Sequence, residues 1–280
     1  MSAVDAVFKA YDIRGTYPDQ LDADLCRRIG TAFADFAFPA GAAAVPAGAT
    51  GERRIIVARD MRPSGVELSG AFIEGVISTG VDVIDIGMAS TDLLYFAAGA
   101  LDAPGAMLTA SHNPAQYNGI KLCLAGARPV GEETGLADIK AAVVGASAGR
   151  IEEVEGQRRG EVSHRELIDE YAVHVRSFID TRALRPLKVI ADTANGMGGL
   201  VVPRAFAGLP IELEILYGEL DGTFPNHPAD PIQPENLVDL QKRVLETGAD
   251  VGLAFDGDAD RVFLVDDLAQ PVSGLSLIHI

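Results

Sequence analysis

Basic residues are scarce in this chain of 280 residues. Lysine and arginine number 23 against 40 aspartates and glutamates, which gives a formal net charge of −17. Nucleic-acid binding needs a basic face for the phosphate backbone, so we expect no nucleic-acid partner. A small phosphorylated ligand stays compatible with this charge, because a local cluster of cationic side chains and a metal ion can reverse the potential inside one cleft.

Long apolar segments and cysteines are also lacking. No apolar stretch approaches the roughly 20 residues of a membrane-spanning helix, and residues 1–5 lack the basic and apolar regions that begin a signal peptide. The two cysteines, Cys26 and Cys123, show no metal-ligand spacing, which fits a reducing compartment. We therefore expect a soluble, cytoplasmic protein with no membrane partner. The sequence indicates no particular oligomeric state.

Apolar runs alternate with amphipathic stretches along the chain, which predicts βα units rather than a sandwich or a helical bundle. The length favours two compact units. Strands are predicted at residues 54–58, 81–86, 105–108, 119–124, 187–191, 211–216, 251–255 and 262–265. Helices are predicted at residues 22–36, 64–78, 91–100, 135–144, 164–179, 199–207 and 234–247.

Two stretches interrupt the alternation of predicted strands and helices, and one predicted helix carries a start signal. Residues 38–51 are rich in alanine, glycine and proline and predict a long surface loop. The polar stretch 145–161 predicts the boundary between the first two domains. Ser163, with Glu166 three positions later, predicts a capping box that begins the helix at 164–179.

A hydroxyl-bearing segment, Thr-Ala-Ser-His-Asn-Pro at residues 109–114, follows a short apolar strand. The backbone has to turn at His112, Asn113 and Pro114, which can expose Ser111 at the carboxyl end of a sheet, where α/β ligand sites lie. A serine that only caps a helix or a turn is the alternative. A hydrolase triad is not supported, because there is no Gly-x-Ser-x-Gly turn.

An aspartate-rich segment, Asp-Gly-Asp-Ala-Asp-Arg at residues 256–261, connects two predicted strands. On an extended connection, Asp256, Asp258 and Asp260 would project to one side, where three carboxylates suit a hard divalent cation. An EF-hand does not fit, because Arg261 stands where that loop needs glycine and the flanks are strands. The alternative is a solvated acidic hairpin; Arg261 argues against it, because a guanidinium beside a metal suits a phosphate.

Further motifs place basic residues in this acidic chain, and together they carry a resemblance. In chain order the five motifs are YDIRG at 11–15, ARDMR at 58–62, TASHNP at 109–114, NGIK at 118–121 and DGDADR at 256–261. This set resembles the α-D-phosphohexomutase superfamily, and most closely its bacterial phosphomannomutase/phosphoglucomutase branch. Residues 192–196 and 221–228 add to the likeness as structural turns. The resemblance spans almost the whole chain.

The resemblance implies a fold, a reaction and a set of site residues. The fold would be two consecutive mixed-sheet α/β domains, at 1–150 and 160–255, with the metal loop and the start of a third domain at 256–280. The reaction would be Mg²⁺-dependent phosphoryl transfer between the 1- and 6-positions of mannose or glucose phosphate, an isomerisation through phosphoserine and a hexose 1,6-bisphosphate. The implied metal ligands are Ser111, Asp256, Asp258 and Asp260; the implied catalytic and substrate-binding residues are Ser111, Lys121, His112, Arg14, Arg261, Tyr11, Arg59 and Asn113.

The sequence departs from the family pattern downstream of the metal loop. Family members have four domains, with a sugar-recognition loop in the third and a phosphate-binding loop in the fourth, so we expect a chain truncated after the metal loop. Residues 131–135 resemble the sugar loop, but their position predicts the start of a helix instead. The apolar residues 275–280 end in a strand-like run, which indicates either truncation or a foreign tail, and we expect no function for His279.

Alternative functions follow from the same motifs. Phosphoglucosamine mutases share the serine and metal motifs, although their amino-terminal motif usually differs from residues 9–12 of this chain. A Mg²⁺-dependent sugar-phosphate-binding fragment without turnover is another reading. A phosphatase of the haloacid dehalogenase type is disfavoured, because its nucleophile is an aspartate and Ser111 would have no role.

Overall fold

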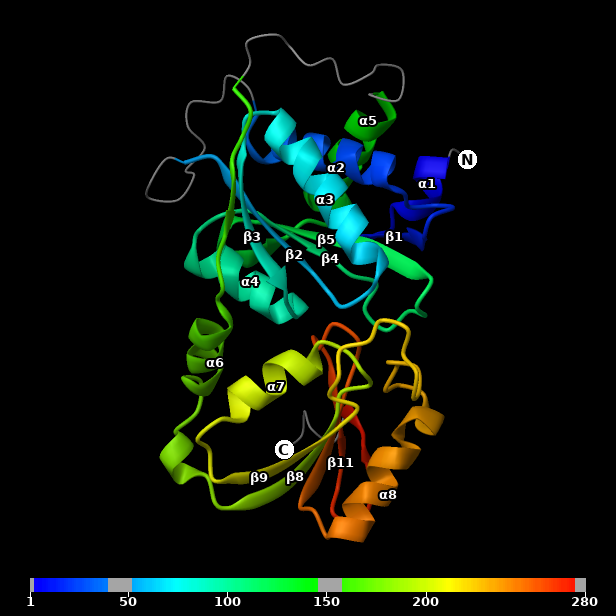
Figure 1. The fold of residues 1–280 in the computed structure, drawn as a ribbon, viewed down its shortest axis with the longest axis vertical. Helices are drawn as coiled ribbons and strands as arrows, with labels where there is room; N and C mark the ends of the chain where they lie inside the picture. Colours follow the sequence, from blue (N-terminus) through cyan, green and yellow to red (C-terminus); the bar gives the residue numbers. More distant parts are fainter. Residues whose placement is uncertain (1–2, 40–51, 146–157, 275–280) are drawn as a thin grey trace. The chain divides into compact units, whose positions relative to one another are not determined.

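The computed structural model describes residues 3–39, 52–145 and 158–274, which form two compact units (Figure 1). The first unit consists of residues 1–88, 93–110 and 116–166. The second consists of residues 89–92, 111–115 and 167–280. Two short segments that lie early in the sequence, 89–92 and 111–115, therefore cluster with the later part of the chain. Each unit is described on its own below.

The first unit contains a mixed sheet whose strands run in the order β1-β5-β4-β2-β3-β7, with β6 beside β5. Neighbours among β4, β2, β3 and β7 are parallel, whereas β5 runs antiparallel to β1, β4 and β6. The strands are β1 Ile13–Thr16, β2 Arg54–Arg59, β3 Asp82–Met88, β4 Gly105–Leu108, β5 Tyr117–Leu124, β6 Arg128–Pro129 and β7 Val162–His164.

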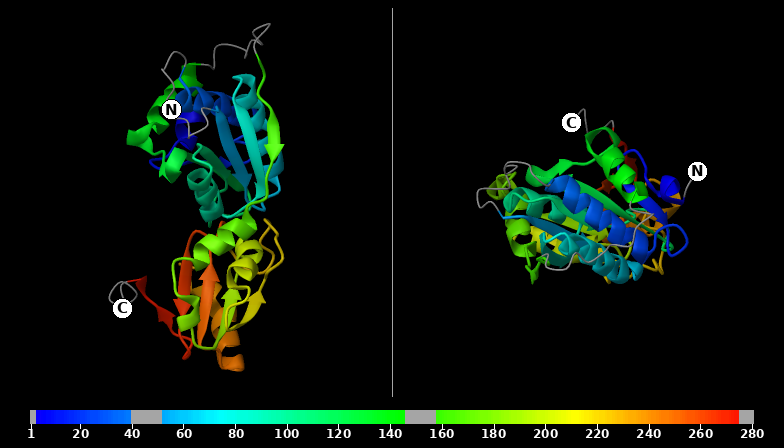
Figure 2. Two further views of the ribbon diagram at one scale, coloured as in Figure 1. Left: turned by 90° about the vertical axis from the view of Figure 1, so that its left-hand side faces the viewer. Right: turned by 90° about the horizontal axis from the view of Figure 1, so that it is seen from above.

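Helices cover both faces of this sheet (Figure 2). One face carries α2 Ala23–Ala37, α3 Ser64–Ser78 and α5 Leu136–Gly145, and α4 Thr91–Ala100 lies on the other face; the short α1 Ala3–Val7 precedes β1. Ile55 and Val57 of β2 join the large core beneath α2 and α3, and all four residues of β4 are buried. Burial on both faces explains why these strands appear in the sequence as continuous apolar runs.

The second unit contains a five-stranded sheet in the order β12-β11-β10-β8-β9. β8 is parallel to β9 and β10, and β11 is antiparallel to β10 and β12. Its strands are β8 Leu187–Asp192, β9 Ile211–Leu216, β10 Val251–Phe255, β11 Val262–Val265 and β12 Pro271–Val272; its helices are α6 Ile168–Arg176, α7 Gly198–Phe206 and α8 Val238–Thr247. Leu240 and Val244 of α8 pack on Ile190 and Ala254 of the sheet.

The predicted fold class is confirmed: both units are α/β with mixed sheets. Each predicted strand and helix has a counterpart, but α1, β1, β6, β7 and β12 were not predicted. The boundaries predicted near residues 150, 160 and 255 stay predictions. In the described residues β11 and β12 extend the sheet of the second unit beyond residue 255. Most of the predicted loop 38–51, most of the boundary stretch 145–161 and the tail 275–280 lie outside the described residues.

The predicted capping box at Ser163 is wrong. Ser163 lies in β7, which pairs in parallel with β3, and its hydroxyl donates to the carbonyl of Val83 at 3.2 Å. The helix begins only at Ile168. A local spacing of Ser and Glu was outweighed by pairing with a strand some eighty residues earlier in the sequence.

The residues predicted as turns, 192–196 and 221–228, bind each other in the second unit. Asn226 Nδ2 donates to Asn195 Oδ1 at 2.8 Å, and His227 Nε2 lies 3.0 Å from a carboxylate oxygen of buried Asp192. The ring of Tyr217 packs edge-on against the imidazole of His227. Burial acts to lower the pKa of His227, but the hydrogen bond and charge of Asp192 outweigh it, so the net shift of the pKa is upward.

None of the helices in the described part of the chain is both long enough and apolar enough to cross a bilayer.

The pair of His227 and Asp192 predicts a specific pH dependence of stability. Because the folded-state pKa of His227 lies above its ordinary value of 6.5, the stabilisation is fully present below that value and is lost as pH rises through the folded pKa. The free energy of unfolding of wild type should therefore exceed that of His227→Gln more at about pH 5.5 than at about pH 8.5. His174→Gln, at an exposed histidine of α6 whose ring packs against Phe178, is the control, and a gap that widens with rising pH would contradict the prediction.

Candidate active site

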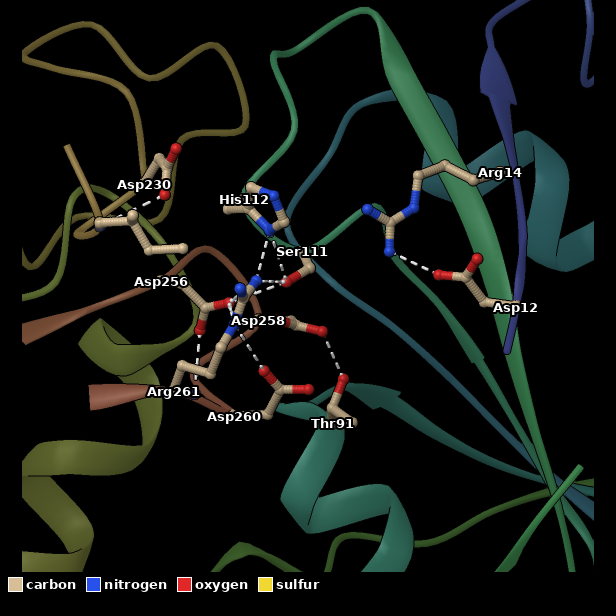
Figure 3. A network of polar contacts seen from close by, with 11 residues as sticks. Asp12, Arg14, Thr91, Ser111, His112, Asp230, Asp256, Asp258, Asp260 and Arg261 are labelled. Atoms are coloured by element: carbon tan, nitrogen blue, oxygen red, sulfur yellow. Dashed lines mark hydrogen bonds and ion pairs between the residues drawn. The ribbon is translucent and has the colours of Figure 1, made fainter. Parts of the chain in front are cut away.

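Ser111 stands just beyond β4 in a strained backbone conformation. Its φ is 51°, in the left-handed region that L-residues other than glycine rarely occupy. The sequence suggested an exposed hydroxyl, but Ser111 is only 2% exposed. The hydroxyl donates to Asp256 Oδ2 at 2.7 Å (Figure 3). The serine is thus aimed directly at the aspartate loop.

The aspartate loop, residues 256–261, is a tight turn between β10 and β11. The backbone N–H of Ala259 donates to the carbonyl of Asp256 at 3.1 Å, and Ala259 itself has a φ of 56°. We expected the carboxylates to converge because side chains alternate along an extended segment, and this explanation is wrong. The convergence itself is present: one oxygen from each of Asp256, Asp258 and Asp260 lies within 4.8 Å of the others.

Arg261 joins the serine segment to the aspartate loop. Its Nε donates to Asp256 Oδ2 at 2.9 Å, and its Nη2 donates to Ser111 Oγ at 2.6 Å. The guanidinium also donates to Nδ1 of His112. One cation thus contacts both the hydroxyl and the carboxylate, so a charge that develops on Ser111 Oγ would be met by a fixed positive group.

The electrostatics of the loop fit a bound cation. Burial raises the pKa of Asp256 to about 7, and the charges of Asp258 and Asp260 act in the same direction, against the opposing effects of Ser111 and Arg261. Three carboxylates face one guanidinium, so negative charge is in excess. Convergent carboxylate oxygens are the ligands that hard divalent cations prefer. Asp256, Asp258 and Asp260 can therefore hold a metal ion, as the sequence predicted.

Gly257 allows the two segments to approach closely. A Cβ built on Gly257 would lie 2.4 Å from the carbonyl oxygen of Ser111, closer than real Cβ atoms come. On the other side of the loop, the N–H of Met197 donates to the carbonyl of Gly257 at 2.9 Å. The aspartate loop is consequently held between the Ser111 segment and the turn at 193–197.

Thr91 is a residue of this site that the sequence did not reveal. It begins α4, and its hydroxyl donates to Asp258 Oδ2 at 2.6 Å. Its N–H also donates to the carbonyl of Asp258 at 3.1 Å. The contact joins residues 167 positions apart. In the sequence Thr91 carries only the signal of a helix start, which does not point to a metal loop.

The other predicted site residues divide between the two units. Asn113 belongs to the second unit together with Ser111 and His112. Tyr11, Arg14, Arg59 and Lys121 belong to the first unit.

Within the first unit, these residues lie on or beside neighbouring strands. Arg14 of β1 forms an ion pair with Asp12. Lys121 lies on β5 opposite Met107 of β4, and Arg59 ends β2. Tyr11 precedes β1 and is 85% exposed. Their roles stay predictions.

Models of protein families match both units. Phosphoglucomutase/phosphomannomutase domain I, an alpha/beta/alpha domain, matches residues 5–147, and domain II of the same family matches residues 169–269. The chain belongs to this family. The resemblance stated from the five motifs is thereby confirmed.

Curated relatives and solved structures of this family cover nearly all of the chain. A phosphomannomutase of Salmonella montevideo is 38% identical over 97% of this chain and 57% of its own length. A phosphomannomutase/phosphoglucomutase of Pseudomonas putida is 40% identical over 96% of this chain and 54% of its own. A crystal structure of a family protein from Burkholderia thailandensis, 36% identical, has a TM-score of 0.82 and shares 97% of this chain and 56% of its own. The chain thus spans somewhat more than half the length of these relatives.

The close approach at Gly257 predicts the effect of an added methyl group. Gly257→Ala should lower the free energy of unfolding by about 1–3 kcal/mol, because the Ser111 segment or the aspartate loop must shift. Gly70→Ala is the control: no atom lies within 4 Å of its Cβ, and alanine in the middle of α3 should be neutral or stabilise by up to about 1 kcal/mol. Urea unfolding measures both. A Gly257→Ala variant as stable as wild type would contradict the packing described for this glycine.

Proposed function

We propose that the chain carries out the phosphoryl-transfer chemistry of a hexose phosphate mutase, with Ser111 as the phosphate carrier. The observation that carries the proposal is the direct contact of Ser111 Oγ with both Asp256 and Arg261. A hydroxyl nucleophile beside a cation-binding carboxylate cluster and a guanidinium is the equipment of phosphoryl transfer. The names of the relatives, phosphomannomutase and phosphomannomutase/phosphoglucomutase, support mannose or glucose phosphates as the substrates.

The proposed reaction consists of two successive phosphoryl transfers, each of which moves a different phosphoryl group. Phosphoserine at position 111 donates its phosphoryl group to a free hydroxyl of the hexose monophosphate: an O–P bond to the sugar forms as the O–P bond to Ser111 breaks. The resulting hexose 1,6-bisphosphate returns its other phosphoryl group to Ser111. The net result is a phosphate moved between the 1- and 6-positions, with the enzyme again phosphorylated.

Charge stabilisation is assigned to the second unit. Asp256, Asp258 and Asp260, with an oxygen on Ser111, would hold Mg²⁺, which when bound neutralises charge that develops on the transferring phosphoryl group. Arg261 keeps a second positive group on Ser111 Oγ. These charged groups are already in place and need not reorganise during the transfer, which is what makes preorganised charges effective in catalysis.

Proton transfer and substrate binding are assigned to further residues. The accepting sugar hydroxyl must lose a proton, and Lys121 and His112 are the proposed general acid/base groups. Arg14, Arg59, Tyr11 and Asn113 are proposed to contact the phosphate or the sugar. We also propose a cytoplasmic location, which the two cysteines without metal-ligand spacing support.

Phosphorylation of Ser111 tests the proposal. After incubation with glucose 1,6-bisphosphate and Mg²⁺, intact-mass spectrometry should show one added phosphoryl group, which peptide sequencing should place on Ser111. Ser111→Ala should take up none and should reduce mutase activity to that of the blank, whereas Ser69→Ala, at a half-buried serine of α3, should behave as wild type.

Two other outcomes of the phosphorylation experiment would argue against mutase activity. Wild type that stays unphosphorylated, or that carries the phosphate on another residue, would contradict the proposal. Phosphorylated Ser111 without interconversion of glucose or mannose phosphates in a coupled assay would favour the alternative of a sugar-phosphate-binding chain that does not turn over.

A further inference from the structure

We infer that Thr91 is a positioning residue for the metal site: its hydroxyl fixes the carboxylate of Asp258 for the cation. The inference rests on the proposed function for the identity of the metal loop, and it assigns a role to a residue outside all five sequence motifs. The observations that carry it are the two hydrogen bonds from Thr91 to Asp258, one from the side chain and one from the backbone.

The geometry of these two bonds restrains both the position and the rotation of Asp258. The bond from the N–H of Thr91 to the carbonyl of Asp258 fixes the backbone of the loop at this residue. The bond from the hydroxyl to Oδ2, at 2.6 Å, fixes the rotation of the carboxylate plane. Both residues are fully buried, so water does not compete for the donor. Once one oxygen is fixed in this way, the direction of the other oxygen is fixed as well.

Ser111 and Thr91 thus each donate a hydrogen bond to one of the three aspartates. The proposed reaction phosphorylates the hydroxyl group of Ser111 and leaves that of Thr91 unchanged. Ser111 donates to Asp256 at 2.7 Å, but a phosphorylated Ser111 has no hydroxyl proton to donate. Thr91 keeps its proton throughout the proposed reaction, because it contacts Asp258 and takes no part in transfer. Asp258 therefore keeps its orientation while the surroundings of Asp256 change.

Thr91 is itself anchored firmly. Thr91 and Ser90 belong to the second unit together with Asp258, and Thr91 is the first residue of α4. The preceding residue, Ser90, is fully buried and forms a side-chain hydrogen bond with Tyr171 of α6. The residue that precedes the donor is consequently anchored within the second unit. Residues that orient metal ligands in this way typically account for about 10–100-fold in metal affinity.

A pair of substitutions separates the hydroxyl from the shape of the side chain. Thr91→Val keeps the size and removes the donor, and Thr91→Ser keeps the donor. We expect Thr91→Val to weaken Mn²⁺ binding by about 10–100-fold, measured by electron paramagnetic resonance on the full dephosphorylated chain, with Thr91→Ser close to wild type. Thr31→Val, which removes a hydroxyl that binds only backbone carbonyls of α2 and α3, is the control for a lost hydrogen bond.

The measurement distinguishes positioning from general stability. Thermal unfolding without metal shows how far each variant is destabilised, and Thr31→Val should keep wild-type affinity for Mn²⁺ whatever stability it loses. Thr91→Val with wild-type affinity, or a Thr31→Val variant that weakens binding equally, would overturn the inference.

The proposed function can fail separately, because Mn²⁺ binding needs no sugar. Wild type that binds Mn²⁺ but takes up no phosphate from the bisphosphate would contradict the mutase chemistry, and the variants would still decide the role of Thr91. Wild type without a saturable Mn²⁺ site would overturn the role of Thr91 as well.

Discussion

Repulsion among three carboxylates in one short turn is the constraint on which this site depends. Asp256 and Asp258 are fully buried, and Asp260 lies close to both. Burial and like charge disfavour the ionised forms, which is why the pKa of Asp256 is raised. Arg261 offsets part of this charge, and the hydroxyl groups of Ser111 and Thr91 stabilise two of the carboxylates by hydrogen bonds. A bound cation would neutralise the remaining negative charge, so the repulsion among the carboxylates and their capacity to hold a metal ion have the same origin.

The fold holds the turn in place from several directions. The antiparallel pair β10 and β11 fixes its two ends, the N–H of Met197 binds the carbonyl of Gly257, and the Ser111 segment packs against the same glycine. Ser111 accepts a left-handed backbone conformation as part of this packing. Strain of this kind persists only where the surroundings enforce it. A hydroxyl placed in this way is directed at the carboxylates before any substrate arrives.

The sequence was most informative where the chemistry is contiguous. Asp256, Asp258 and Asp260 lie within one segment, and the segment around Ser111 keeps its motif intact, so both could be found without knowing any contact. The long-range features could not: Thr91 meets Asp258 across 167 positions, and the burial of Ser111 depends on a loop encoded 145 positions later. The capping box at Ser163 failed for the same reason, because pairing of β7 with β3 determines that segment. The predicted convergence of the three carboxylates is present, but the reason given for it, the alternation of side chains along a strand, is wrong, because residues 256–261 form a turn.

The most direct test of the account compares the thermal stability of wild type and Asp258→Asn with and without Mg²⁺. Without metal, removing one of three repelling charges should leave the variant as stable as wild type or more stable. Mg²⁺ should raise the Tm of wild type by mass action and should have little effect on the variant, whereas Asp267→Asn, at an exposed aspartate, should respond as wild type does. A wild-type Tm that does not change with Mg²⁺, or an Asp258→Asn variant that is stabilised equally, would contradict the claim that these carboxylates form a metal site.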